Sequence, residues 1–254
     1  MLVAGFPADA FGTNCYVLAP AAGEQCLIVD PGIGVLGQLD EMLARYHLHP
    51  AAVLLTHGHL DHTFSVAPVC GARGVTAYIH PDDRELLADP AKGLSTDLAS
   101  LFGGRLPYSE PEDVAPLTDG ATLKLAGLEL TVAHAPGHTR GSVLFRLSAG
   151  GSPPAREGLA VPSMVETPWE SGELCFSGDV LFAGSIGRTD LPGGSMPQML
   201  ASLREKILPL ADQTVVLPGH GPITSIGRER ADNPYLRQVA AGAAGAGPGP
   251  TRGW

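Results

Sequence analysis

Short apolar runs that alternate with polar positions recur along most of this chain, and they predict its regular structure. Short β-rich or apolar runs bounded by turn residues indicate strands, whereas apolar residues at helical spacing indicate helices. Strands are predicted at residues 14–18, 26–30, 52–56, 75–79, 122–125, 128–133, 142–147, 174–177 and 214–217. Helices are predicted at residues 35–46, 82–88 and 198–207.

The order of these elements predicts an α/β fold with two sheets and helices outside them. Turn residues separate the first two strands and also the pair 122–125 and 128–133, so each pair is expected to form a hairpin. Neither a linker nor an internal repeat divides the chain, and we expect one domain over residues 1–239. Residues 148–173, rich in Gly, Pro and Ser, read as a long surface insertion. Residues 240–254 are dominated by Ala, Gly and Pro, so a disordered tail is expected there.

Composition excludes several classes of protein. A net charge of −10 leaves no general basic surface for nucleic acid or for an anionic membrane. The four cysteines lie too far apart in sequence for a zinc ribbon, and we interpret them as buried thiols of a reducing compartment. With no signal-peptide pattern at the N-terminus and no apolar run of about 20 residues, we expect a cytoplasmic protein.

The strongest chemical signal is the segment Thr56-His57-Gly58-His59-Leu60-Asp61-His62, which directly follows a predicted strand. Gly58 permits a tight turn, so that His57 and His59 can converge on one metal ion. Asp61 and His62 can then face a second ion. The alternative is a polar surface loop, but nine histidines in 254 residues would seldom place three within six positions by chance.

Three more potential ligands follow predicted strands. His138 and His220 each lie in a Pro-Gly-His turn, and Asp179 ends the segment Phe176-Ser177-Gly178-Asp179. Together with the central segment they supply seven nitrogen and carboxylate ligands without a thiolate, a donor set that suits zinc, iron or manganese. The sequence therefore predicts two divalent metal ions, with zinc favoured.

The combination His-x-His-x-Asp-His, Pro-Gly-His, Gly-Asp and Pro-Gly-His resembles the metallo-β-lactamase superfamily over residues 14–236. The resemblance implies a four-layer αββα sandwich. It also implies that His57, His59 and His138 hold one metal, that Asp61, His62 and His220 hold the second, and that Asp179 bridges the two. Asp61 and Asp179 are the side chains expected to serve catalysis directly. A metal pair lowers the pKa of bound water from 15.7 to about 7, so neither a Ser nor a Cys nucleophile is required.

Residues 184–194, 219–222 and 233–235, together with Glu229, resemble the short single-domain members of the glyoxalase II group. That resemblance implies hydrolysis of a small anionic thioester such as S-lactoylglutathione. Arg188 is the candidate for binding a substrate carboxylate, and its alternative role is a salt bridge with Asp190. Where longer glyoxalase II enzymes carry a C-terminal helical domain, this sequence has an Ala-, Gly- and Pro-rich stretch, so we do not expect that domain here. The insertion at residues 148–173 is also unlike the tight hairpin that is usual in the group.

Supporting roles are less defined. Thr56, Thr139 and Asp30 are candidates for orienting the ligands, or they are ordinary turn and capping residues. His134 could line the pocket or be purely structural. The remaining histidines, His47, His49 and His80, are expected to be solvated.

Other functions remain open at the level of sequence. A persulfide dioxygenase resembles the same group and would use one iron, held by His57, His138 and Asp179; the complete second ligand set favours hydrolysis. A nuclease is disfavoured by the acidic charge, and a non-catalytic binding protein by the intact ligands. A β-lactamase is disfavoured by the missing export signal.

Overall fold

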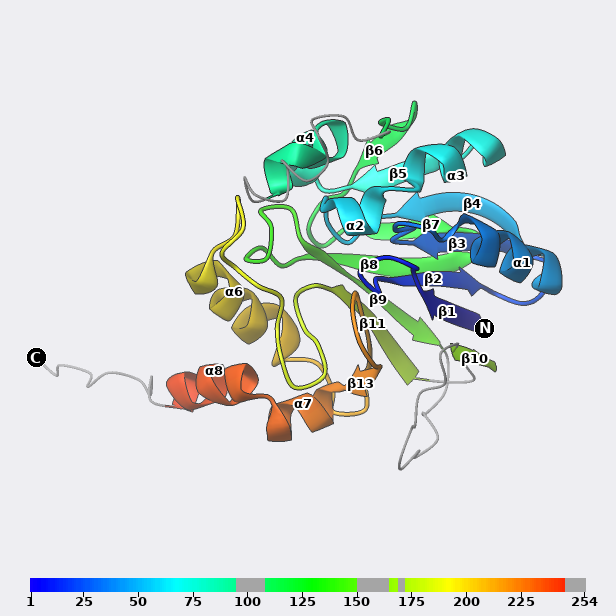
Figure 1. Ribbon diagram of the computed structural model, residues 1–254. Coiled ribbons are helices and arrows are strands. Elements are labelled where there is room, and N and C mark those ends of the chain that lie inside the picture. The colour runs from blue at the N-terminus through cyan, green and yellow to red at the C-terminus, as the bar shows by residue number, and fades with distance from the viewer. Residues whose placement is uncertain (95–107, 150–164, 169–171, 245–254) are drawn as a thin grey trace, which may run out of the picture.

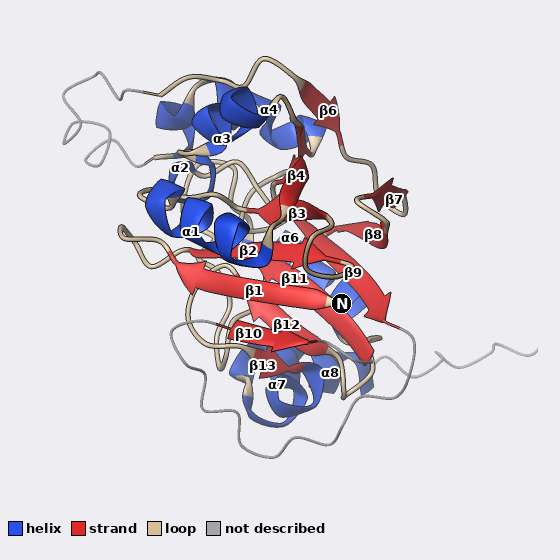
Figure 2. Ribbon diagram, turned by 90° about the vertical axis from the view of Figure 1, so that its right-hand side faces the viewer, coloured by secondary structure: helices blue, strands red, loops and turns tan. Residues whose placement is uncertain are grey.

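A computed structural model describes residues 1–94, 108–149, 165–168 and 172–244. Its two sheets lie face to face, with helices on both outer sides (Figures 1 and 2). The seven-stranded sheet has the order β10-β1-β2-β3-β4-β5-β6, and the six-stranded sheet has the order β13-β12-β11-β9-β8-β7. The predicted αββα sandwich is therefore confirmed.

The first half of the chain contributes β1 (Leu2–Pro7), β2 (Asn14–Ala19), β3 (Gln25–Val29), α1 (Leu36–Tyr46), β4 (His49–Leu54), α2 (Leu60–Thr63), α3 (Val66–Arg73), β5 (Thr76–Ile79), η1 (Pro81–Asp83), α4 (Arg84–Ala88), η2 (Pro90–Gly93) and β6 (Val114–Pro116). The second half contributes β7 (Thr122–Leu125), β8 (Leu128–His134), β9 (Val143–Ala149), β10 (Val165–Pro168), β11 (Gly172–Gly178), α6 (Met196–Ser202), η3 (Leu203–Ile207), β12 (Val215–Pro218), β13 (Thr224–Ser225), α7 (Ile226–Asp232) and α8 (Pro234–Ala244).

Three buried apolar clusters correspond to the three interfaces between the four layers. Successive side chains of a strand point to opposite faces, so each strand serves two clusters. In β2, Cys15 and Val17 face the cluster beneath α1 and α3, whereas Tyr16 and Leu18 face the cluster between the sheets. In β9, Leu144 joins the third cluster, beneath α6, α7 and α8. Neighbouring residues of one strand therefore pack in different layers of the sandwich.

Several elements were not predicted, among them β1, α3, β6, α7 and α8. Two predicted segments also differ from the structure. Within the insertion at residues 148–173, β10 pairs antiparallel with β1, so this part of the insertion extends the first sheet. The stretch 150–164 lies outside the described residues. The expected tail begins too early, because α8 continues to Ala244; alanine is the strongest helix former, and this outweighs the Gly and Pro content that suggested a tail. Residues 245–254 lie outside the described residues.

Among the described helices, none has the length and apolar character needed to cross a bilayer. All four cysteines are buried free thiols, as expected from their spacing.

Candidate metal centre

The predicted ligands all lie just beyond strand ends at one edge of the sandwich. His57 and His59 follow β4, and His138 lies in the connection from β8 to β9. Asp179 and His220 follow β11 and β12. Since β8 and β11 are both antiparallel to β9, and β12 is parallel to β11, their carboxyl ends meet at the same edge, where α/β proteins place their sites.

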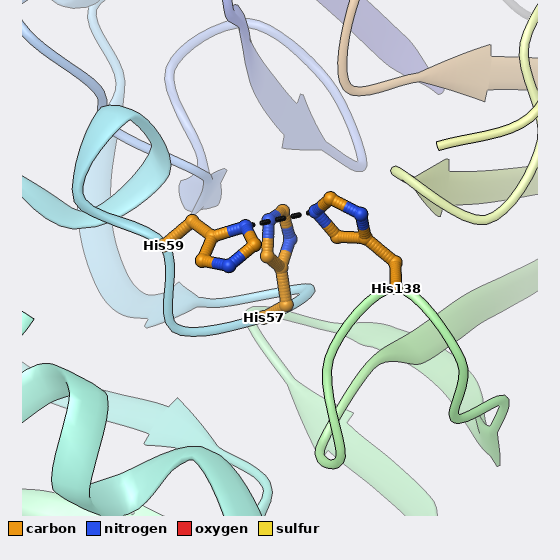
Figure 3. Close-up of side chains that lie close together, drawn as sticks. All are labelled: His57, His59 and His138. Atoms are coloured by element: carbon orange, nitrogen blue, oxygen red, sulfur yellow. Dashed lines mark hydrogen bonds between the residues drawn. The ribbon is translucent and has the colours of Figure 1, made fainter. Parts of the chain in front are cut away.

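His57, His59 and His138 form the first group of ligands. Their imidazoles converge from two connections (Figure 3). Nδ1 of His59 lies 2.8 Å from Nε2 of His138. Two nitrogen ligands of one tetrahedral zinc are separated by about 3.3 Å, given zinc–nitrogen bonds of about 2.0–2.1 Å. The imidazoles are therefore spaced closely enough to share one ion after a small adjustment.

Asp61, His62 and His220 form the second group. Nε2 of His62 lies 3.2 Å from Nε2 of His220, which lies 3.2 Å from Oδ2 of Asp61. Asp179 connects the groups: its Oδ1 lies 3.4 Å from Nε2 of His62, and its Oδ2 lies 3.5 Å from Nε2 of His138. All seven residues predicted from sequence therefore meet in one place.

Unsatisfied polar atoms provide an independent test of whether metals fit here. In the described part of the chain, Nε2 of His57 and Oδ1 of Asp179 are buried without a hydrogen-bond partner. A buried polar atom left unpaired is unfavourable by about 1–3 kcal/mol, so native sites rarely contain one without a reason. Both atoms point into the ligand cluster, and a bound cation would satisfy them.

Protonation also favours a metal in the first group. Burial, followed by the neighbouring imidazoles, lowers the pKa of His57 well below its ordinary value. Burial and His138 lower the pKa of His59 to about 3. Both rings are therefore neutral at physiological pH, which is the form that binds metal.

In the second group, charge opposes burial. Burial favours neutral carboxyls, but the imidazole of His62 holds the pKa of Asp61 and Asp179 below their ordinary values. The same carboxylates outweigh burial at His62 and His220 and raise the pKa of both imidazoles. Without a metal, this half of the site therefore retains protons that compensate its negative charge.

A buried carboxylate orients the ligands from behind. Asp30 follows β3 with φ of 49° and accepts hydrogen bonds from the backbone N–H of Thr56 at 2.8 Å and from its hydroxyl at 2.6 Å. Its Oδ2 lies 3.0 Å from Nδ1 of His62, and the hydroxyl oxygen of Thr56 lies 3.1 Å from Nδ1 of His57. These contacts direct Nε2 of both rings toward the metal site. Thr56 and Asp30 thus have the orienting role considered from sequence.

Asp83 is a second orienting carboxylate, and sequence reasoning missed it. Its Oδ2 accepts hydrogen bonds from the backbone N–H of Gly58 at 2.9 Å and the hydroxyl of Thr139 at 2.6 Å, while its Oδ1 accepts one from Gly141 at 2.7 Å. It therefore ties together the two connections that carry the first ligand group. A Pro-Asp-Asp turn gives no local sign of this role.

Arg188 contacts the site through its backbone. Its carbonyl oxygen lies 2.7 Å from Nδ1 of His138, which leaves Nε2 free for a metal. Its guanidinium donates two hydrogen bonds to Asp190, at 2.8 and 2.7 Å, in an exposed pair. The salt bridge considered from sequence is therefore present, and substrate binding by Arg188 stays a prediction.

The other histidines divide into two kinds. His47 and His49 are exposed, as predicted. His80 was expected to be solvated, but its ring stacks on that of His134 with centroids 4.0 Å apart and planes 8° apart, and its side chain is only 12% exposed. His134 lines a cavity beside the ligand loops.

Known proteins resemble this chain in sequence and in fold. Residues 8–151 match the family model of the metallo-β-lactamase superfamily. The chain belongs to this superfamily. It is 45% identical to an uncharacterized protein of Mycobacterium tuberculosis, over 94% of this chain and all of that one. It is 33% identical to the probable metallo-hydrolase YqgX of Bacillus subtilis and 32% identical to the hydroxyacylglutathione hydrolase GloC of Haemophilus influenzae, in each case over 91% of this chain and 95% of the relative.

Solved structures of the superfamily match over most of the chain. BLEG-1, described as a B3 metallo-β-lactamase, is 35% identical with a TM-score of 0.73, over 92% of this chain and 99% of that one. TTHA1623 in a di-iron-bound form is 33% identical with a TM-score of 0.68, over 91% and 99%. ETHE1 from Myxococcus xanthus, at 21% identity with a TM-score of 0.67 over 99% and 93%, shares the fold. This member of the superfamily is thus a metal-dependent hydrolase with histidine and aspartate groups suited to divalent ions.

Proposed function

We propose that this protein hydrolyses a small anionic thioester of the hydroxyacyl-glutathione kind and uses two divalent metal ions. The convergence of both complete ligand groups, joined by Asp179, carries the proposal. The 32% identity to GloC over nearly the whole of both chains supports the thioester as the substrate class.

In this proposal His57, His59 and His138 would hold the first ion, Asp61, His62 and His220 would hold the second, and Asp179 would be shared between them. Such a pair polarises a carbonyl oxygen and makes a water acidic enough to act as a nucleophile at neutral pH. Zinc suits these donors, and iron and manganese also fit; TTHA1623 binds two irons.

The chain's own residues define the side from which a substrate approaches. The first ligand group is buried, whereas the side chains of Asp61 and His220 are 24% and 28% exposed. Phe182 contacts His220 edge to face at 6.0 Å between ring centroids, and exposed Phe11 accepts a hydrogen bond from Nδ1 of His220 through its carbonyl oxygen. A small acyl group would therefore meet aromatic surface beside the second metal.

A thiol nucleophile has no support in the chain. Burial raises the pKa of Cys70 to about 11 and of Cys26 and Cys175 to about 12, and it also raises that of Cys15. A thiolate leaving group is stable enough to depart without a dedicated general acid. Because all four cysteines are free, we also propose a cytoplasmic location.

Lactam hydrolysis is the second candidate, favoured by the 35% identity to BLEG-1. One set of measurements separates the candidates. Protein purified without added metal is analysed for metal content and then assayed with S-lactoylglutathione, other acyl thioesters, nitrocefin, and an oxygen electrode with glutathione persulfide.

We expect about two ions per chain and turnover of thioesters. Nitrocefin cleavage without thioester cleavage would favour the lactam. Oxygen uptake with a single iron would favour the persulfide dioxygenase instead. If no acyl thioester is hydrolysed by metal-loaded protein, the proposal fails.

A further inference from the structure

A polar cavity of about 500 Å³ lies beside the metal centre and is lined by Asp82, His134, Pro136, Arg140, Gly193, Gly194, Ser195 and Gln198. In Figure 1 the connection from β8 to β9, which carries Arg140, extends between α4 and α6, and His134 is the last residue of β8. The cavity falls within the volume range of about 300–1,000 Å³ typical of sites for small ligands. None of its lining residues belongs to the metal ligands.

Arg140 gives this cavity its positive charge. Across the described ranges, no hydrogen bond or ion pair of its guanidinium is found, whereas Arg188 is committed to Asp190. Its Cγ lies 3.7 Å from the position that a Cβ on Gly193 would occupy, so the side chain runs along the cavity wall. Arg140 also contributes, after Lys92, to lowering the pKa of the exposed Glu85 carboxyl. An arginine with no hydrogen bond or ion pair among the described residues, next to a cavity, is suited to a carboxylate in a bidentate arrangement.

The imidazole of His134 is held in place beside Arg140. Its backbone N–H donates to Asp119 at 2.8 Å, its Nε2 lies 2.8 Å from the carbonyl oxygen of Arg140, and its ring stacks on His80. With Nε2–H donated to that carbonyl, Nδ1 is available as an acceptor. Asp82 adds an exposed carboxylate to the rim. The cavity therefore presents one cation together with hydrogen-bond acceptors.

Two lining residues of the cavity are close neighbours in sequence of His138, a member of the first ligand group. Pro136 and Arg140 lie two positions on either side of His138, so their Cα atoms are within about 7 Å of its Cα. The segment that supplies Gly193 and Gly194 follows Arg188, whose carbonyl orients His138. One substrate molecule could therefore place its acyl group at the metals and its carrier portion in the cavity.

We propose that this cavity binds the carboxylate end of an amino-acid-like or peptide-like carrier of the substrate, with Arg140 as its charged contact. The inference rests on the proposed thioester hydrolysis. Asp82 and Nδ1 of His134 accept hydrogen bonds from the ligand's N–H groups beside that carboxylate. Arg140 is a specificity-determining residue and not a metal ligand.

Two readouts test the proposal, one with turnover and one without. Steady-state kinetics compare S-lactoylglutathione with S-lactoyl-N-acetylcysteamine, which carries the same acyl group without any carboxylate. Isothermal titration with S-methylglutathione, which has the carboxylates but neither a thioester to hydrolyse nor a thiolate to bind metal, reports binding without turnover. The variants are Arg140→Gln and Asp82→Asn, and exposed Arg237→Gln on α8 is the matched control.

Loss of a charge-assisted hydrogen bond predicts that Arg140→Gln raises KM for S-lactoylglutathione about 10- to 100-fold. Its kcat should stay within a factor of two, and KM for the neutral thioester should not change. S-methylglutathione should bind wild-type protein and Arg237→Gln equally and Arg140→Gln more weakly. Asp82→Asn should weaken its binding to a lesser degree.

Equal binding of S-methylglutathione to Arg140→Gln and Arg237→Gln, or no binding to either or to wild type, would overturn the inference. Failure of the proposed function is a separate result: no thioester would be hydrolysed by any variant, while the titration would still report whether the cavity takes the carboxylate. A thermal unfolding curve of Arg140→Gln should match that of wild type, because the side chain is exposed.

Discussion

Replacing Asp83 by Asn tests whether the metal centre depends on a residue that binds no metal. The buried Asp83 carboxylate accepts hydrogen bonds from Gly58, Thr139 and Gly141, at 2.9, 2.6 and 2.7 Å. An asparagine has one oxygen and one NH₂ group. In either orientation the NH₂ group therefore faces a backbone N–H, that of Gly58 or that of Gly141, and leaves it unpaired.

The magnitude follows from this count. Losing one hydrogen bond to a charged acceptor and leaving one buried donor unsatisfied should reduce the free energy of unfolding by about 2–4 kcal/mol. For a domain of this size, each kcal/mol lowers Tm by about 2–4 °C. Because Gly58 lies between two ligands and Thr139 follows a third, affinity for the first metal should fall about 10- to 100-fold.

Urea unfolding measures the stability, and competition with a chelator of known affinity measures metal binding. The matched control is Asp89→Asn, an exposed aspartate at the end of α4 with no side-chain cap hydrogen bond. Asp83→Asn protein that keeps both metals at wild-type affinity and unfolds within about 0.5 kcal/mol of wild type would refute the assigned role of Asp83.

Four further predictions concern the same centre. Asp179→Ala should lower the content of both metals and abolish turnover, because its two oxygens face both ligand groups; unchanged metal content by elemental analysis would contradict the bridge. Gly219→Ala should impair metal binding, because its Cβ would lie 2.2 Å from Oδ1 of Asp179 and 2.7 Å from Cε1 of His62. The control Gly37→Ala, whose Cβ would have no atom within 4 Å, should bind metal normally. Equal metal content in the two variants would argue against this close packing. Arg188→Gln should leave Tm unchanged, since an exposed ion pair contributes about 0–1 kcal/mol, and should raise KM by less than Arg140→Gln, because the Arg188 guanidinium already pairs with Asp190; a larger rise would make Arg188 the main carboxylate contact. Metal removal by a chelator should lower Tm. Metal affinity should rise with pH, because His62 and His220, whose pKa is raised by neighbouring carboxylates, must lose protons to bind metal. Calorimetric titration with metal in buffers of different ionisation enthalpy would detect the released protons, and their absence would contradict the assignment.

The sequence by itself indicated most of the central strands and the seven candidate ligands, but not elements such as β1, α3 and α7. The continuous apolar run at residues 15–18 reflects a strand that is buried on both faces, whereas apolar and polar positions alternate over residues 128–131 because one face of that strand is exposed. Both are local properties that appear directly in the order of residues. His57, His59, Asp61 and His62 are neighbours in the chain, so their convergence requires only a tight turn. His138, Asp179 and His220 could be identified because each follows a strand in a small-residue turn, and resemblance to a known superfamily joined them to the first four.

Only the tertiary structure decided what surrounds those ligands. Asp83 and Thr139 are 56 positions apart, and His138 and the Arg188 carbonyl are 50 apart, so no periodicity in the chain indicates that they meet. The same holds for β10, which completes a sheet from within an apparent insertion, for the stacking of His80 on His134, and for the cavity beside Arg140. Such contacts depend on the path of the whole backbone, because a hydrogen bond or a stacked ring is specific in space to a few tenths of an ångström, whereas sequence patterns specify only which face of an element is buried.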